Sequence, residues 1–249
     1  MYPILFRIGG LEVTSFGLMV GLGAVVAAWL FTRELEARGL GLAGNLALVG
    51  LIAGMAGAKL LWVGEHFGEE STLEQLTSRG GLSWFGGLVG GVGAGLAVAV
   101  YRRWPLLPLL AAAAPAVAVG QALGRIGCFL VGDDYGLPTS LPWGVAFPRG
   151  LPPTTVPVHP TQLYEAAFLA VLAWRLVRWR RHGLSDRAQL ALYCLLAGAF
   201  RFLLEFVRTN VRVAAGLTVA QYASVLLVLA GAVLLVWSRR GVTAPAAVR

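Results

Sequence analysis

Charged residues are scarce in this chain of 249 residues, since they make up 13% of it, whereas an ordinary soluble domain contains about 25%. Together with 57% hydrophobic residues and a mean hydropathy of +0.74, this scarcity excludes a soluble enzyme, a disordered tail and a fibrous protein. Cysteine is also rare: Cys128 and Cys194 form no CxxC pair and have no metal-ligand spacing. We therefore expect no disulfide framework and no zinc site.

The N-terminus lacks the features of a secretory signal peptide. The first residues, MYPILFRIGG, have no basic start and no cleavage site, so we expect the first membrane span to act as the insertion signal. The chain also lacks an acidic balance, because its net charge is +8. In a soluble protein this excess indicates nucleic-acid binding, but in an apolar chain it indicates membrane topology, and no nucleic-acid partner is expected.

Long apolar runs dominate what is present. A membrane-spanning helix needs about 20 mostly apolar residues. Five runs of this kind contain no charge, and two further runs contain a few charges; they cover residues 13–32, 39–58, 80–101, 104–124 and 213–238, then 161–179 and 188–207. The sequence predicts an all-α polytopic membrane protein with seven transmembrane helices, formed by a single integral membrane domain over residues 1–249.

The distribution of basic residues predicts the orientation of this domain. Seven spans place twelve arginines on the side of the C-terminus and six on the side of the N-terminus, with Lys59 and Arg201 inside spans. Because basic residues concentrate in cytoplasmic segments, we predict a cytoplasmic C-terminus and an N-terminus outside. The longest connection, residues 125–160, then faces outward. It contains seven prolines, which predict a rigid functional loop, the alternative being a plain tether.

Ionisable residues inside apolar runs need partners or a task, because each costs about 2.5 to 3.5 kcal/mol in a bilayer. Arg201, Glu205 and Arg208 occur in RFLLEFVR at a spacing that places them on one helix face. Glu205 can pair with either arginine, which leaves one guanidinium to bind an anion such as phosphate. The alternative is an arginine–glutamate clamp that only holds helices together.

Two further motifs carry candidate polar residues. Arg125 begins a glycine-rich stretch, GRIGCFLVGDDYG, that also contains Asp133; an arginine among glycines at the end of a span resembles an anion cradle, the alternative being a snorkelling side chain. Lys59 in GAKLLW either snorkels or faces the same interior. Residues 159–165, HPTQLYE, begin the fifth predicted span, and in them His159 is a helix cap or a proton carrier.

Within the HPTQLYE string, Gln162 and Glu165 share a helix face, and Glu165 lies inside a span.

Residues 80–95 are dense in glycine, with Gly86 and Gly90 four residues apart. This spacing favours close helix packing, the alternative being room for a lipid. Taken alone, these residues predict an interior, outward-facing site that binds an anion, and a phospholipid is the simplest ligand.

These motifs, in this order, resemble the bacterial prolipoprotein diacylglyceryl transferase family. The resemblance extends along nearly the whole chain through VTSFGLM, GAKLLW, GGLSWFGGLVG, GRIGCFLVGDDYG, HPTQLYE, RFLLEFVR and GLTVAQ. It implies that the protein moves the diacylglyceryl group of phosphatidylglycerol onto the lipobox cysteine thiol of a prolipoprotein and releases glycerol phosphate. It also implies a location in the bacterial inner membrane with the site on the outer side, and it implies no metal and no organic cofactor.

The resemblance assigns candidate roles residue by residue. It implies that Arg125 and Arg201, with Glu205, act in catalysis. His159 and Glu165 are further catalytic candidates, as acid–base groups, because of their places in the sequence. The candidate substrate-binding residues are Arg125, Arg208, Gly136, Asp133, Lys59, Gln162 and Tyr164. Fixed arginines suit the stabilisation of a departing phosphate, and the attacking thiol requires a base.

The sequence departs from the family pattern where protons are handled. Phe85 stands where a histidine is usual, Phe16 replaces a tyrosine, and Cys128 replaces an asparagine. The phosphate-binding residues are retained, so we hypothesise that His159, Glu165 or Asp133 serves as the base, aided by His66. Two other interpretations stay open: a lipid transferase with another acceptor, and a lipid-binding protein without catalysis.

We expect the Phe85→His substitution to leave the transfer activity unchanged or to raise it, because it would restore the usual histidine of the family. The measurement is the rate of diacylglyceryl transfer to a lipobox peptide. A large loss of activity would show that this chain uses the position differently.

Overall fold

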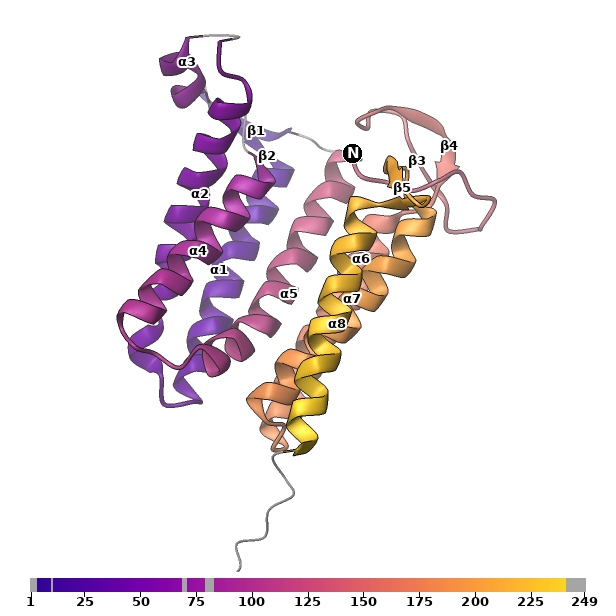
Figure 1. The fold of residues 1–249 in the computed structure, drawn as a ribbon. Coiled ribbons are helices and arrows are strands. Elements are labelled where there is room, and N and C mark those ends of the chain that lie inside the picture. Colours follow the sequence, from indigo (N-terminus) through magenta and orange to yellow (C-terminus); the bar gives the residue numbers. More distant parts are fainter. Residues whose placement is uncertain (1–3, 10, 69–70, 79–82, 241–249) are drawn as a thin grey trace, which may run out of the picture. The chain divides into compact units, whose positions relative to one another are not determined.

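The computed structural model describes residues 4–9, 11–68, 71–78 and 83–240. Residues 80–82, where the predicted third span begins, lie outside this description, as do the side chains of Trp84 and Phe85. The chain divides into two compact units (Figure 1), one formed by Met1–Ala27 and Leu110–Arg249 and the other by Ala28–Leu109. The candidate residues near Arg125 and Arg208 belong to the first unit, and Lys59 belongs to the second.

The described residues form a mostly helical protein, as predicted. Seven helices in this part of the chain have at least 18 residues: α1 (Ser15–Glu36), α2 (Leu46–Glu65), α4 (Trp84–Tyr101), α5 (Leu106–Val131), α6 (Thr161–Arg181), α7 (Asp186–Leu204) and α8 (Val219–Arg240). Shorter helices are η1 (Gly41–Ala43), α3 (Thr72–Thr77) and η2 (Glu205–Val207).

Among the described residues, five helices are long and apolar enough to cross a membrane, namely α1, α2, α5, α7 continued by η2, and α8. In α4 the apolar segment counted is the shorter Val89–Tyr101. Helix α6 is excluded by its charges, because Glu165, Arg175 and Arg178 lie within its first 18 residues. The fold is that of a polytopic helical membrane protein, whereas the seven-span count and the orientation stay predictions.

Several helix boundaries differ from the predicted spans. Helix α2 begins at Leu46 instead of residue 39, because Gly39 has a left-handed backbone (φ 72°) and η1 follows it. Helix α5 continues to Val131 instead of ending at residue 124, so Arg125 is helical and does not begin a loop. Helix α7 ends at Leu204 and passes into η2, so Arg208 lies beyond the helix in extended backbone.

The described residues also form three short antiparallel hairpins, which the apolar runs did not predict; the first precedes α1 and the other two lie between helices. They are β1–β2 (Ile4–Ile8 with Leu11–Thr14), β3–β4 (Val145–Phe147 with Thr154–Val158) and β5–β6 (Arg212–Ala214 with Leu217–Thr218). The β3–β4 hairpin lies inside the proline-rich connection. The strands of this hairpin are short because the prolines in and beside them cannot donate hydrogen bonds to a neighbouring strand.

In the second unit, α2 and α4 pack through bare backbone. A Cβ atom on Gly90 would lie 2.5 Å from the carbonyl oxygen of Ala53, and one on Gly57 would collide with the carbonyl oxygen of Gly86. Glycine at these positions therefore permits an approach that a larger residue prevents. This confirms the interpretation of the glycine-rich stretch as a close helix-packing surface.

In the first unit, α5 and α6 pack through small and branched apolar residues, including Ala118, Ala122, Leu169 and Ala173. Helix α5 also contains Pro115, which has no N–H to donate to the carbonyl of Ala111 four residues earlier. Buried Gln189 of α7 donates its Nε2 hydrogen to that carbonyl oxygen at 3.1 Å. A side chain from a neighbouring helix thus satisfies the acceptor that proline leaves without its helical donor.

We expect Gln189→Leu to lower the free energy of unfolding by about 1 to 3 kcal/mol, because it leaves the Ala111 carbonyl buried without a donor. The measurement is unfolding by sodium dodecyl sulfate in mixed micelles. Gln121→Leu is the matched control, since Gln121 is an exposed residue of α5 and the same change there is expected to cost less than about 0.5 kcal/mol. Equal stability of the two variants would contradict the assignment.

Candidate functional site

Polar side chains of the first unit gather at one end of its helices. The C-terminal end of α5, the N-terminal end of α6, the C-terminal end of α7 and the N-terminal end of α8 lie together there, beside the hairpins β3–β4 and β5–β6 (Figure 1). Three arginines and three carboxylates from these segments form a connected set. We name it the arginine–carboxylate cluster; its members are Arg125, Arg201, Arg208, Asp134, Glu165 and Glu205.

Asp134 joins two of the arginines. Arg125 Nη1 donates to Asp134 Oδ2 at 2.7 Å, and Arg208 Nη2 lies 2.9 Å from Asp134 Oδ1. Arg125 Nε also pairs with Glu165 Oε2 at 2.9 Å. Burial acts to raise the pKa of Asp134, but Arg208 and Arg125 outweigh it and hold that pKa below its usual value. Asp134 is therefore a carboxylate that orients both guanidiniums.

Glu205 is the buried centre of the other half of the cluster, with 2% of its surface exposed. Its Oε2 forms an ion pair with Arg201 Nη1 and lies 3.8 Å from Arg208 Nε. Its Oε1 accepts hydrogen bonds from Asn210 Nδ2 at 2.6 Å and from Thr218 Oγ1 at 2.8 Å. Four partners thus hold one carboxylate, which fixes the position of the arginines that it contacts.

Thr218 is itself fixed by the start of α8. Its backbone N–H donates to Gln221 Oε1 at 3.0 Å, and the backbone N–H of Gln221 donates to Thr218 Oγ1 at 3.2 Å. This reciprocal pair is a capping box, in which each side chain satisfies a free backbone donor of the first helical turn. The GLTVAQ string therefore positions a hydroxyl against Glu205.

The sequence predicted that one guanidinium would be left without a carboxylate. In the structure each of the three arginines has a carboxylate partner. Within the described part of the chain, the buried donors of the cluster that lack a hydrogen-bond partner are on Arg208, whose side chain is 4% exposed. Its Nε and Nη1 atoms are buried and have no hydrogen-bond partner among the described residues. Burial, together with Arg125 and Arg201, lowers the pKa of Arg208, while Asp134 opposes that shift. A buried cation with unsatisfied donors is suited to bind an anion.

Gly136 brings the connection after α5 against the cluster. Its N–H donates to the carbonyl of His159 at 2.9 Å, and it bridges to Arg208 in an antiparallel pair. A Cβ atom there would collide with the carbonyl oxygen of Val207 and would lie 2.8 Å from Thr161 Cγ2. Glycine is therefore required by close backbone approach.

Side chains at the start of α6 hold the same connection by its carbonyls. Thr161 Oγ1 donates to the carbonyl oxygen of Asp134 at 2.9 Å, and Gln162 Nε2 donates to that of Asp133 at 2.5 Å. Both side chains belong to fully buried residues. Gln162 thus positions the backbone beside the cluster and supports Asp134 indirectly.

Asp133 lies next to the cluster, close to Cys128. Burial raises the pKa of Asp133 above its ordinary value, and its Oδ1 is buried without a hydrogen-bond partner among the described residues. Ligand atoms of Cys128, Asp133 and Asp134 lie within 4.8 Å of one another. Arg125 already bonds Asp134 there and disfavours a second cation, so we assign no metal to these residues.

His159 contacts Tyr164 and does not cap α6, which was one of the two roles that the sequence left open for it. Pro160 is the N-terminal cap residue of α6, and no side chain caps that end. Trp143 Nε1 donates to the Tyr164 hydroxyl at 2.7 Å, and the hydroxyl lies 3.4 Å from His159 Nδ1. Because Tyr164 oxygen accepts from Trp143, its own proton is available to Nδ1. This arrangement favours the tautomer of His159 that carries its proton on Nε2.

Other predicted residues lie in different surroundings. Lys59 Nζ donates to the carbonyl and hydroxyl oxygens of Ser78 at 2.8 and 2.9 Å, within the second unit. His66, also in that unit, contacts the carbonyl of Trp62 through Nδ1 at 2.9 Å. Phe16 is exposed, at 42%. Their roles stay predictions.

Sequence reasoning missed three members of this network: Asp134, Asn210 and Thr218. Each lies in a connection between helices, where polar residues are ordinary and do not by themselves indicate a site. The one available signal for Asp134 was its place beside Asp133 in the motif that contains Arg125.

Comparisons with known proteins identify the family. Residues 3–237 match the family described as prolipoprotein diacylglyceryl transferase. The phosphatidylglycerol–prolipoprotein diacylglyceryl transferase of Clostridium tetani is 34% identical over 224 residues, which cover 85% of this chain and 87% of that protein. The Geobacter sulfurreducens protein of the same name is 35% identical over 219 residues, covering 83% and 82%. The chain belongs to the prolipoprotein diacylglyceryl transferase family.

Proposed function

We propose that this protein transfers the diacylglyceryl group of phosphatidylglycerol to the lipobox cysteine thiol of prolipoproteins and releases glycerol phosphate. The names of its relatives support both the donor and the prolipoprotein acceptor. The observation that carries the proposal is Arg208, a buried guanidinium with unsatisfied donors beside Arg125 and Arg201. A lipid phosphate supplies the acceptor oxygens that these donors lack.

In the proposed reaction, the cysteine sulfur attacks the glyceryl carbon that carries the phosphate oxygen. A carbon–sulfur bond forms, the carbon–oxygen bond breaks, and both bonding electrons leave with glycerol phosphate. Arg125, Arg201 and Arg208 stabilise the departing phosphate, which is the task that fixed cationic donors perform best. Asp134, Glu165 and Glu205 hold the three guanidiniums in place before the substrate binds.

The thiol proton needs an acceptor, and of the three candidate bases Asp133 has the most suitable surroundings. Glu165 is paired with Arg125 at 2.9 Å, so its carboxylate already serves to orient that guanidinium. His159 is placed to accept a hydrogen bond from the Tyr164 hydroxyl at Nδ1, so its Nε2 serves as a donor. Asp133 has a raised pKa and a buried oxygen without a partner. We assign the base to Asp133, and to His159 the donation of a hydrogen bond.

Gln162, Tyr164 and Gly136 complete the proposed site as positioning residues, because they hold the connection and the ring of His159. Lys59 is proposed to bind substrate. The protein is proposed to be one integral membrane domain of the bacterial inner membrane with seven spans and an N-terminus outside. The connection after α5, residues 132–160, and the cluster then face the outer side, where secreted lipoprotein precursors are found.

The test is the intact mass of a synthetic lipobox peptide after incubation with the purified protein in phosphatidylglycerol vesicles. A gain of one diacylglyceryl unit, absent when the peptide cysteine is replaced by serine, is the expected result. No gain, while a relative is active in the same vesicles, would overturn the proposal. It would favour another acceptor or lipid binding without transfer.

A further inference from the structure

The far end of α6 carries a second concentration of arginine. The last turns of α6 and the turn into α7 contain five arginines against one carboxylate, Asp186; the arginines are Arg175, Arg178, Arg180, Arg181 and Arg187. Helix α6 has 21 residues, which corresponds to a length of about 30 Å. The arginine–carboxylate cluster lies at its other end, so these arginines cannot share the phosphate bound there.

Five residues form a continuous exposed stripe on α6, which we name the α6 stripe. They follow the helical spacing i, i+3, i+4, i+7 and i+10 that places side chains on one face; they are Val171, Trp174, Arg175, Arg178 and Arg181. Val171 and Trp174 are each 56% exposed, and the three arginines are exposed as well. Along the helix the stripe therefore changes from apolar, through an indole, to cationic.

The three arginines of the α6 stripe have no carboxylate partner among the described residues. The one acidic side chain in the turn, Asp186, lies 3.5 Å from Arg180 Nε, which is not in the stripe. The guanidinium of Arg175 lies 5.0 Å from the ring centre of Trp174 and 5.9 Å from that of Trp179. These contacts orient Arg175 without neutralising it.

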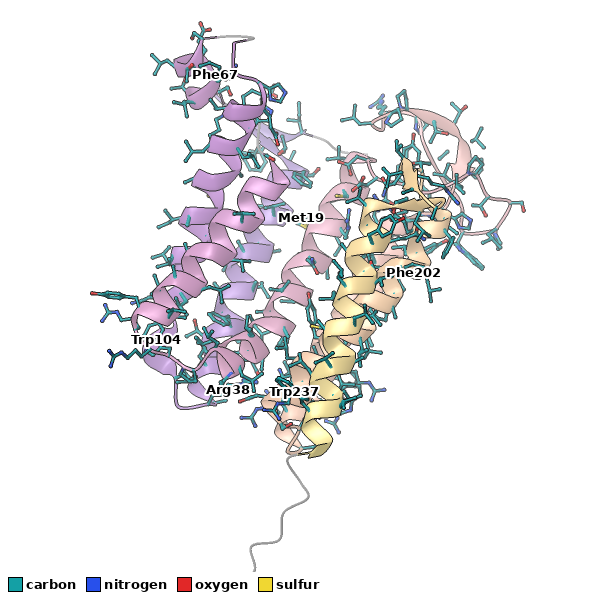
Figure 2. All side chains as sticks on the ribbon, viewed as in Figure 1. Met19, Arg38, Phe67, Trp104, Phe202 and Trp237 are labelled. Atoms are coloured by element: carbon teal, nitrogen blue, oxygen red, sulfur yellow. The ribbon has the colours of Figure 1, made fainter. Side chains whose placement is uncertain are left out.

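The neighbouring helices place the same end at a membrane face. Arg187 Nη1 donates to the carbonyl oxygen of Trp237 at 3.2 Å, and Trp237 lies at the end of the span formed by α8. Figure 2 shows Phe202 of α7 and Trp237 of α8 at opposite ends of this helix pair. Exposed tryptophan beside basic residues is typical of the headgroup level of a bilayer.

We propose that the α6 stripe binds the phosphodiester headgroup of an anionic phospholipid at the membrane face opposite the arginine–carboxylate cluster. Arg175, Arg178 and Arg181 contact the headgroup phosphate, and Val171 and Trp174 contact the upper part of an acyl chain. The order of apolar, aromatic and cationic residues along one helix face matches the order of chain, interface and phosphate in a lipid. This site is separate from the proposed transfer reaction and does not rest on it.

The test compares lipid binding by three forms of the full-length protein in detergent, measured by native mass spectrometry. The stripe variant carries Arg175→Gln, Arg178→Gln and Arg181→Gln. The matched control carries Arg33→Gln, Arg102→Gln and Arg103→Gln, which removes the same charge from exposed positions and includes an arginine over a tryptophan ring, Arg33 on Trp29. The probes are dioleoylphosphatidylglycerol, dioleoylphosphatidylcholine and inorganic phosphate.

The expected result is that the stripe variant binds phosphatidylglycerol about tenfold more weakly than wild type, since each surface arginine contributes to the attraction of an anionic headgroup. The control variant is expected to bind it as wild type does. Equal weakening in both variants would overturn the site in favour of general surface charge. Displacement of the lipid by inorganic phosphate at equal concentration would overturn the lipid assignment in favour of a free anion.

A second measurement keeps the proposal falsifiable if the stripe variant does not fold. The Arg208→Gln protein, in which the phosphate site of the cluster is weakened and the α6 stripe is intact, is titrated with phosphatidylglycerol and with phosphatidylcholine. Preferential binding of phosphatidylglycerol is expected to persist in that variant. Equal binding of the two lipids would overturn the proposal.

Discussion

Replacing Arg208 by glutamine is expected to lower the rate of diacylglyceryl transfer by about 100- to 1,000-fold, the usual cost of removing one fixed donor from a developing anion. The reason is that Arg208 supplies the buried donors of the cluster that no described residue satisfies. The remaining pairs survive the change, because Asp134 keeps Arg125 and Glu205 keeps Arg201. The variant is therefore expected to fold.

The assay is the initial rate of peptide modification over a range of phosphatidylglycerol concentrations. Stabilisation of the departing phosphate predicts that kcat falls more than KM rises. Arg208→Lys is expected to be impaired as well. A planar guanidinium can donate to Asp134 and to a phosphate at the same time, whereas the compact ammonium of lysine cannot reproduce that arrangement of donors.

Arg212→Gln is the matched control for Arg208. Arg212 is an exposed arginine four residues later, and its side chain donates to the carbonyl of Gly216. The same substitution there is expected to leave the rate within about twofold of wild type, since surface changes have small effects. A folded Arg208→Gln protein that transfers as fast as the Arg212→Gln control would contradict the role of Arg208.

The helices could be predicted from the sequence because a bilayer requires about 20 consecutive apolar residues for each span. Their ends could not, because local partners set them. Helix α5 continues through Arg125 to Val131. The predicted span ended at residue 124, because the run of apolar residues stops before the charge of Arg125. The ion pairs of Arg125 with Asp134 and Glu165 make that charge compatible with a helix, and these partners lie 9 and 40 residues away in sequence.

The candidate site was predictable where polar residues interrupt apolar runs. Arg201, Glu205 and Glu165 stand out because a charge inside a span is costly. Asp134 and Thr218 occur in connections where polar residues are ordinary, so the sequence offered no comparable signal. Asp134 reaches the two arginines from a left-handed backbone conformation (φ 57°), and Thr218 reaches Glu205 from the capping box of α8. Both features are properties of the folded chain.

Removing the negative charge of Glu205 is expected to cause the largest loss of stability. Glutamine at this position keeps an amide oxygen that can accept from Asn210 and Thr218, but it leaves Arg201 without a carboxylate. Breaking a buried pair in this way costs about 3 to 5 kcal/mol. The free energy of unfolding in mixed micelles with sodium dodecyl sulfate measures the loss. Glu36→Gln, at an exposed residue of α1, is the control, with an expected change below about 0.5 kcal/mol.

The double substitution Arg201→Gln with Glu205→Gln separates charge from packing. If the loss in Glu205→Gln comes from an uncompensated guanidinium, removing that guanidinium recovers at least about 1 kcal/mol, because the two residues are coupled in one ion pair. Arg208 still has Asp134 as its partner in the double variant. A double variant that is less stable than Glu205→Gln would show that Arg201 stabilises the fold by its contacts and not by its pairing. The double variant is expected to be stable but inactive, since a guanidinium that binds phosphate has been removed together with the carboxylate that orients it.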